Sequence, residues 1–145
     1  MRAFQRTAAN RCPLTDEQKR HYLPRLADGV EIPCFALTEP HAGSDAAAIT
    51  TRAVADGDHF VLNGAKQWNT GASDARLFLV FAKTASSQDQ DAVTCFAVER
   101  GTPGFTLGRI EDKMGLCASD TADLHFEDCR IPKENLLGRE GQGFK

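Results

Sequence analysis

A short loop brings a hydroxyl group together with several small residues. In the stretch CFALTEPHAGSD (34–45), an apolar run ends at Thr38, and small residues including Gly43 precede Ser44 and Asp45. A hydroxyl can donate and accept hydrogen bonds, and a glycine lets a ligand approach the backbone closely. Ser44 or Asp45 can cap the run DAAAI, whose first amides would suit a phosphate. A plain strand followed by a capped turn has the same composition, so the stretch alone leaves both interpretations open.

A second stretch, NGAKQWNTGASD (63–74), contains the only tryptophan of the chain, Trp68, two residues before Thr70. In a strand these two side chains project to the same side. A flat aromatic beside a hydroxyl could serve a flat ligand ring with polar edges, because the indole packs on the ring and the hydroxyl bonds its edge. A tryptophan in the core of a sheet gives the same pattern, so this interpretation also stays open.

The elements that must position these residues begin with a helical pattern over residues 1–33. Thr15 is the expected N-cap, and Gln18 stands at the capping-box position. We expect Pro24 to break or kink the helix near Leu23. The expected buried face consists of Tyr22, Leu23 and Leu26.

From Ile32 onward, short apolar runs and turn residues replace the helical pattern. A strand is expected at 34–37, followed by two strands around the turn at 56–58 and a second turn at Asn63-Gly64. The run 76–84 is apolar on both faces, which predicts a central strand. Further strands are expected at 92–100, 105–110 and 122–132, with a polar loop at 86–91, a turn at 101–104 and a loop-like tail from 135. The fold class is therefore mainly β, an antiparallel β-barrel or sandwich preceded by a short helical segment.

Composition narrows the classes of function. The 145 residues carry a net charge of −3 and a pI near 5.8, which argues against nucleic acid or an anionic membrane as the main partner. No apolar run reaches the ~18 residues of a membrane span. The five cysteines form no CxxC pair and no histidines pair at ligand spacing, so we expect reduced thiols and no metal site.

Several motifs together carry a resemblance. CFALTEPHAGSDAA, LNGAKQWNTG, DKMGLCASDTADLHFED and FEDCRIPKENLLGREGQGFK resemble the acyl-CoA dehydrogenase family, in this order and at similar spacing, from about Leu14 to Lys145. In that family a carboxylate base removes the α-proton of an acyl-CoA thioester, and the β-hydrogen passes as hydride to noncovalently bound FAD. The resemblance implies three parts: the end of a helical N-terminal domain (1–33), the flavin-binding β-barrel middle domain (34–135), and the start of a C-terminal helical domain (136–145).

The resemblance also implies site residues. Phe35, Ala36, Leu37 and Thr38 would line the flavin ring, with the Thr38 hydroxyl at its polar edge. Gly43 and Ser44 would lie by the pyrophosphate of FAD, and Ser44 also by the pantetheine arm of CoA. The flavin contacts from the second stretch would be Trp68 over one face of the ring, Asn69, and Thr70 near N5.

Three positions depart from the family pattern, and one residue type is missing. His41 stands where Gly is common, Asn69 where Ile is usual, and Gly71 where Asn is usual. The catalytic glutamate of the family would lie beyond Lys145, so we expect no catalytic residue in this chain, weak FAD binding and no activity on its own. Glu39 is expected to orient its loop by hydrogen bonds.

Two other functions stay open: a relative of acyl-CoA oxidases, and a non-catalytic β-barrel binding module. The resemblance implies an acyl-CoA substrate, an electron-transfer flavoprotein as electron acceptor, and a homo-oligomer. It also implies a cytoplasmic location, or the mitochondrial matrix in a eukaryote.

Overall fold

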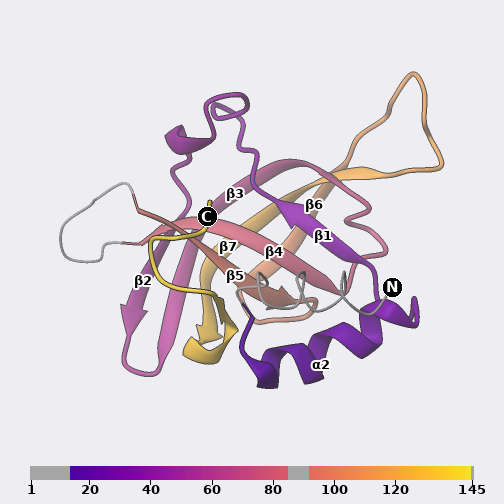
Figure 1. Cartoon of the computed structure of the whole chain (residues 1–145). Coiled ribbons are helices and arrows are strands. Elements are labelled where there is room, and N and C mark those ends of the chain that lie inside the picture. The colour runs from indigo at the N-terminus through magenta and orange to yellow at the C-terminus, as the bar shows by residue number, and fades with distance from the viewer. Residues whose placement is uncertain (1–13, 85–91, 145) are drawn as a thin grey trace.

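The computed structural model describes residues 14–84 and 92–144, in which one helix precedes a curved eight-stranded sheet (Figure 1). The elements are α2 (Asp16–Ala27), β1 (Pro33–Ala36), the 3-10 turn η1 (Ala46–Ala48), β2 (Arg52–Asp56), β3 (His59–Thr70), β4 (Leu77–Thr84), β5 (Val93–Glu99), β6 (Phe105–Ile110), β7 (Thr121–Pro132), the 3-10 turn η2 (Lys133–Asn135) and β8 (Leu136–Leu137). Two expectations, helix over residues 1–13 and a polar loop at 86–91, lie outside the described residues.

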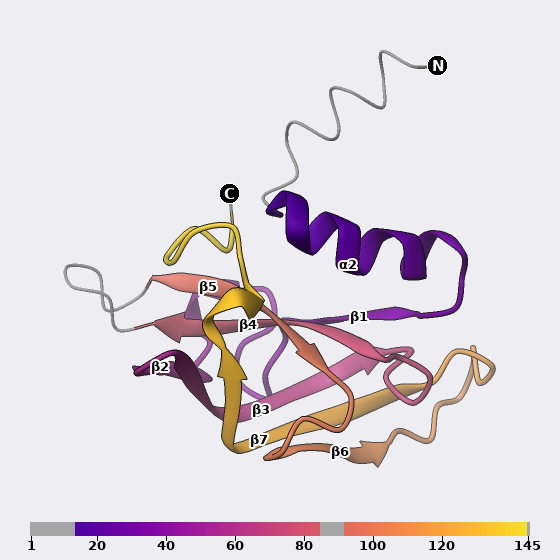
Figure 2. The ribbon, with the colours of Figure 1, turned by 90° about the horizontal axis from the view of Figure 1, so that it is seen from below.

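The capping box at the start of α2 is confirmed. The Thr15 hydroxyl accepts from the Gln18 amide at 3.1 Å, and the Gln18 side chain accepts from the Thr15 amide at 2.9 Å. Gln18 also donates to the carbonyls of Glu134 and Leu136, at 2.6 and 2.8 Å. These bonds attach the helix to the barrel at η2 and β8, and α2 lies beside β1 (Figure 2).

Two expectations about α2 need correction. The helix does not break near Leu23: it runs through Pro24 to Ala27, since Tyr22 and Leu26 on either side of the proline both pack against the barrel, and a kink there stays a prediction. The Leu23 side chain is 43% exposed, whereas Tyr22 and Leu26 face the barrel. Positions 22 and 26 are one turn apart and share a face, and position 23 lies off that face.

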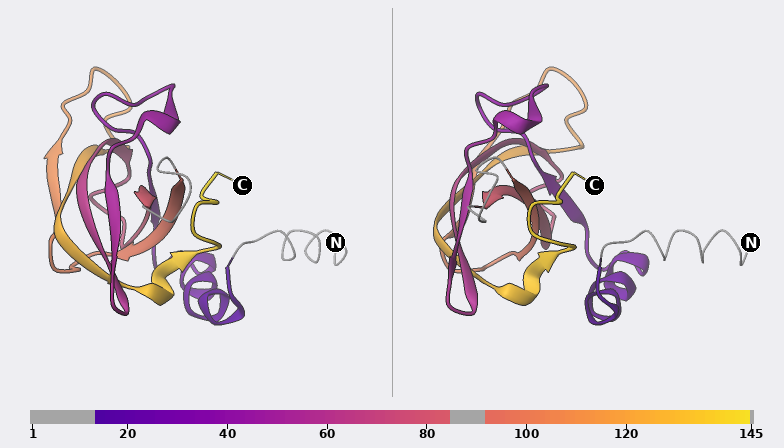
Figure 3. Two further views of the ribbon diagram at one scale, coloured as in Figure 1. Left: turned by 90° about the vertical axis from the view of Figure 1, so that its left-hand side faces the viewer. Right: turned by 60° about the vertical axis from the view of Figure 1, so that its left-hand side comes forward.

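The strands follow the order β6-β7-β3-β2-β4-β5-β8, and β1 pairs with β4. The mainly β class is confirmed, but the sheet is mixed, since β1 and β2 both pair with β4 in parallel. β1 pairs with the first half of β4 (Leu77–Val80) and β2 with its end, at Lys83 and Thr84. Residues 37–51 therefore leave the sheet between two pairings along one edge of β4, and they rise from the end of the barrel opposite α2 (Figure 3).

The expected turn at Asn63-Gly64 is wrong. β3 continues through both residues, and its register against β7 shifts between Leu62 and Gly64. A Cβ at Gly64 would lie 2.6 Å from the Thr51 hydroxyl oxygen, so the glycine allows a close approach of two chains instead of a turn.

The core lies inside the curved sheet. β4 is buried on both faces over most of its length, as expected for a central strand. The turn at 101–104 is confirmed, with positive φ at Gly101 and Gly104. The large side chains packed in the core include Leu62, Phe78, Val80, Phe96, Val98, Leu124, Phe126 and Ile131.

Candidate functional site

The two chemistry-bearing stretches meet at the backbone. The Gln67 amide donates to the Thr38 carbonyl at 2.8 Å, and the Lys66 ammonium donates to the Leu37 carbonyl at 3.1 Å. The end of β1 and the middle of β3 are therefore in direct contact, although about thirty residues separate them in the chain.

Trp68 lies on the surface of the barrel. Its side chain is 60% exposed, so the alternative of a core tryptophan is wrong. The register of β3 against β7 shifts between Lys66 and Asn69, which pair with Leu124 and Ala122, so two residues of β3 stand opposite one of β7. This is a β-bulge, and within it Trp68 has φ 58°. A bulky residue in that region is strained, and such strain concentrates at functional sites.

Alternation along β3 separates the three residues of the second stretch. Trp68 and Thr70 are exposed, and Asn69 between them is only 2% exposed. The Asn69 side chain donates to the Ala122 carbonyl at 2.9 Å inside the barrel. The Asn69 side chain is therefore not available to a ligand on the Trp68 face.

The residues of β1 also alternate between exposed and buried side chains. Phe35 is 58% exposed and packs against Phe81, with ring centroids 4.9 Å apart. The Ala36 side chain is buried in the core, and Leu37 and Thr38 are half-buried where the strand ends. An aromatic side chain and the end of a strand thus face outward together.

The loop 37–51 presents unused polar groups. Within residues 14–84 and 92–144, the hydroxyls of Thr38, Ser44 and Thr70 make no hydrogen bond, and neither do the backbone amides of Gly43 and Ser44. No atom lies within 4 Å of the position that a Cβ on Gly43 would take. Asp45 precedes η1 but its side chain makes no capping bond, so a side-chain cap at this turn is wrong.

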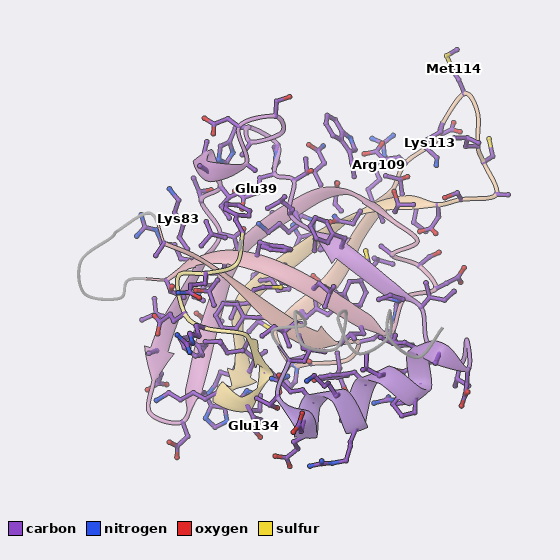
Figure 4. The ribbon with its side chains drawn as sticks, viewed as in Figure 1. Glu39, Lys83, Arg109, Lys113, Met114 and Glu134 are labelled. Atoms are coloured by element: carbon purple, nitrogen blue, oxygen red, sulfur yellow. The ribbon has the colours of Figure 1, made fainter. Side chains whose placement is uncertain are left out.

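Glu39 orients this loop, as expected. Its carboxylate accepts from the Thr50 and Thr51 amides at 2.6 and 3.0 Å and from the Lys66 ammonium at 2.8 Å. Burial raises the pKa of Glu39, but the hydrogen bonds from Lys66, Thr51 and Thr50 outweigh it and lower the pKa to about 2. Figure 4 shows Glu39 at the base of the loop.

The family departure at His41 is accommodated without strain. His41 is not among the residues with positive φ, so its turn does not need a glycine. Its ring nitrogen Nε2 lies 3.6 Å from the Glu39 carboxylate, and the backbone of Glu39 forms a two-bond bridge with that of Ala42. The turn is closed by backbone bonds on either side of the histidine.

Sequence reasoning missed Lys66. Its side chain is 0% exposed and points inward, where an apolar residue is expected. The sequence did contain a signal: inward and outward side chains alternate along β3, and position 66, opposite the buried Leu124, falls on the inward side. Burial lowers the pKa of Lys66, and the Glu39 carboxylate opposes that effect.

The two cavities beside α2 do not involve the predicted site. The more apolar one has a volume of about 550 Å³ and is lined by residues including Tyr22, Leu79, Cys95 and Leu137. None of the predicted site residues lines either of these two cavities. Among residues 14–84 and 92–144 no group of His, Cys, Asp or Glu could hold a metal ion, and no helix there is long and apolar enough to cross a membrane.

Residues 34–129 match the family profile "acyl-CoA dehydrogenase, middle domain". The chain is 50% identical over 133 residues to acryloyl-CoA reductase (NADH) of Anaerotignum propionicum, covering 90% of this chain and 34% of that protein. It is 50% identical over 131 residues to the mitochondrial short-chain specific acyl-CoA dehydrogenase of Rattus norvegicus, covering 90% of this chain and 32% of that protein.

A solved structure agrees with these relatives. The glutaryl-CoA dehydrogenase of Mycobacterium smegmatis in complex with FADH2 superposes with a TM-score of 0.81 at 42% identity, covering 89% of this chain and 32% of that one. The chain thus spans about a third of the length of the proteins it matches.

Proposed function

The chain belongs to the acyl-CoA dehydrogenase family, of which it holds the middle domain, and we propose that it forms the flavin-binding barrel of an enzyme that converts an acyl-CoA thioester to a trans-2-enoyl-CoA. The observation that carries this proposal is the hydrogen bond from the Gln67 amide to the Thr38 carbonyl, which puts the two stretches that we assign to the flavin in direct contact. We assign the activity to a full-length protein that contains this chain, since relatives are about three times its length.

The residues at this surface fit FAD. The exposed Trp68 and Phe35 offer aromatic faces for the ring, and the hydroxyls of Thr38 and Thr70 are unused within the described residues. We assign Trp68 to one ring face and the two threonines to the polar edge, with Thr70 near N5. When bound, FAD supplies the acceptor for the hydride.

The remaining contacts come from backbone and small residues. Ala36, Leu37 and Asn69 contribute through their backbone, since the side chains of Ala36 and Asn69 point into the core and Leu37 is half-buried. The free amides at Gly43 and Ser44 suit the pyrophosphate. We also assign the Ser44 hydroxyl to the pantetheine arm of the acyl-CoA substrate.

The catalytic base is proposed to come from outside these 145 residues. Glu39 does not qualify, because its carboxylate already accepts four hydrogen bonds and its pKa of about 2 makes it a poor proton acceptor at neutral pH. We propose the boundaries 1–33, 34–135 and 136–145 for the end of the N-terminal domain, the barrel and the start of the C-terminal domain, with the short strand β8 (Leu136–Leu137) at the start of the last part still paired with β5 of the barrel.

We propose a homo-oligomer that passes electrons to an electron-transfer flavoprotein, in the cytoplasm or, in a eukaryote, the mitochondrial matrix. The direction of the reaction also needs a test, because one relative is named as a reductase and the other as a dehydrogenase. A relative of the acyl-CoA oxidases would differ in giving its electrons to oxygen.

The decisive experiment mixes the full-length protein, loaded with FAD, with butyryl-CoA or octanoyl-CoA under anaerobic conditions. We expect the flavin absorbance to bleach and enoyl-CoA to form. The 145-residue chain, given FAD and the same substrates, should do neither. If the full-length protein takes up FAD but neither acyl-CoA bleaches the flavin, that result contradicts the proposed reaction. A full-length protein that takes up no FAD supports the binding-module alternative.

Admitting air to the bleached enzyme separates the remaining candidates. Rapid return of the flavin colour with formation of hydrogen peroxide indicates an oxidase. Slow return in air, with fast return on adding electron-transfer flavoprotein, indicates a dehydrogenase. Oxidation of the reduced flavin by acryloyl-CoA, with NADH as electron source, indicates that the protein works as a reductase.

A further inference from the structure

A buried ion pair lies where the two flavin stretches meet. The Lys66 ammonium is 2.8 Å from the Glu39 carboxylate, and the two side chains are 0% and 1% exposed. Removing two charges from water is costly, and replacing such a pair with well-packed apolar residues is often neutral or stabilising. Folding alone therefore does not explain why the barrel contains this pair.

The pair connects three separate segments. Lys66, on β3, donates to the Leu37 carbonyl at the end of β1. Glu39 accepts from the amides of Thr50 and Thr51, just before β2. The two ends of loop 37–51 are thus held together at its base, and that base is held against β3.

Each segment carries part of the proposed flavin site. Thr38 lies between Leu37 and Glu39, and the amides of Gly43 and Ser44 lie within the loop that the pair closes. Trp68 follows Lys66 after one residue, in the bulge of β3. The position of each group relative to the others depends on the bonds that converge on the ion pair.

We propose that Lys66 is a positioning residue for the flavin site, acting through Glu39 and the Leu37 carbonyl. Fully buried, it cannot touch the cofactor. It sets the distances between the Thr38 hydroxyl, the Gly43 and Ser44 amides of loop 37–51, and the Trp68 side chain. This inference rests on the proposed function, because it concerns the geometry of the same site.

The test uses the full-length protein carrying Lys66→Met together with Glu39→Gln. Lys66→Met alone leaves a buried carboxylate without its cation and can fail to fold. The double variant has no unpaired charge, and the side-chain amide introduced by Glu39→Gln keeps one oxygen to accept from the threonine amides. Without the ammonium, the Leu37 carbonyl loses its donor. We expect the dissociation constant for FAD to rise about tenfold or more.

A second readout needs no cofactor. In the FAD-free protein, hydrogen exchange measured by mass spectrometry should become about tenfold faster in the peptides that contain Thr50, Thr51 and Gln67, since local opening of the loop base becomes easier. The matched control is Gln18→Met, which removes three hydrogen bonds of a buried side chain at the α2 end of the barrel. It should leave FAD affinity and these peptides unchanged.

The outcomes separate the two proposals. A wild-type protein that takes up no FAD overturns the proposed function and this inference with it. A double variant that binds FAD as tightly as the wild type overturns the inference alone. Faster exchange spread evenly over the whole barrel also overturns it, because that result describes general loss of stability. Local acceleration at the loop base together with weaker FAD binding supports it.

Discussion

Gly64 and Thr51 approach each other more closely than any residue with a side chain at position 64 would permit. A Cβ on Gly64 would lie 2.6 Å from the Thr51 hydroxyl oxygen and 2.7 Å from the Thr51 α-carbon, and φ at Gly64 is 146°. Thr51 is also where the Glu39 carboxylate holds the end of loop 37–51. The glycine therefore lets β3 pack against the base of the loop that carries the proposed pyrophosphate contacts.

Gly64→Ala should lower the free energy of unfolding by about 3 kcal/mol, because the clash involves backbone atoms and the φ angle disfavours a side chain. Urea unfolding followed by circular dichroism measures the change. Gly115→Ala is the matched control, since nothing lies within 4 Å of its Cβ position and its φ is not positive. Equal stability of the two variants would show that Thr51 can move away freely.

Replacing Trp68 tests both its exposure and its strain. A buried tryptophan costs about 3–5 kcal/mol when changed to alanine, but Trp68 is 60% exposed and should cost roughly 1 kcal/mol. In an ordinary strand glycine is less stable than alanine by roughly 0.5–1 kcal/mol. At φ 58° we expect that order to reverse, with Trp68→Gly at least as stable as Trp68→Ala.

The measurement is again urea unfolding of both variants, paired with FAD titration of the full-length protein, in which both should lose affinity. A penalty near that of a buried tryptophan, or alanine clearly more stable than glycine, contradicts the exposed, strained geometry. Unchanged FAD affinity in both variants contradicts the cofactor role of the indole.

Local pattern predicted most strands and the helix cap, because alternation and the capping box depend on neighbours in the chain. The capping bonds of Thr15 and Gln18 are present as expected. The two parallel pairings of β4 were not predictable, since a strand's own alternation says nothing about the direction of its partner. An antiparallel sheet was therefore expected where a mixed one occurs.

The candidate site was likewise predicted only where residue type and local motif are sufficient. Composition and resemblance identified Thr38, Ser44, Trp68 and Thr70, and the structure exposes Trp68 and links its neighbour Gln67 to Thr38. The buried lysine went unnoticed because its partner, Glu39, is 27 residues away. The strand through Gly64 was mistaken for a turn because Asn-Gly is also a hairpin signal, and only tertiary contact with Thr51 decides between them.

Thr70→Ala should weaken FAD binding without changing the stability of the FAD-free protein. The hydroxyl has no partner within the described residues, so its removal breaks no hydrogen bond of the folded chain. The lost bond to the flavin is worth about 0.5–1.5 kcal/mol, or roughly a two- to twelvefold rise in the dissociation constant. Fluorescence titration with FAD measures it, and Thr70→Ser, which keeps the hydroxyl, is the control. An alanine variant that binds FAD like the serine variant argues against a bond from this residue.

Acid should destabilise the barrel through Glu39. Its pKa falls from 4.5 for an ordinary glutamate to about 2 in the folded chain, so the unfolded state binds more protons between these values. The stabilisation is complete above about pH 4.5 and is lost as the pH falls toward 2, by roughly 3 kcal/mol in total.

Urea midpoints at pH 5, 4 and 3 should therefore fall less steeply with decreasing pH in Glu39→Gln than in the wild type, even though the variant is less stable at pH 5 because Lys66 loses its anion. Glu17→Gln is the control, since Glu17 is exposed and should follow the wild-type slope. If Glu39→Gln and the wild type lose stability in parallel, the carboxylate is not held ionised by its donors. The closed base of loop 37–51 would then have to depend on backbone bonds such as the pair between Glu39 and Ala42.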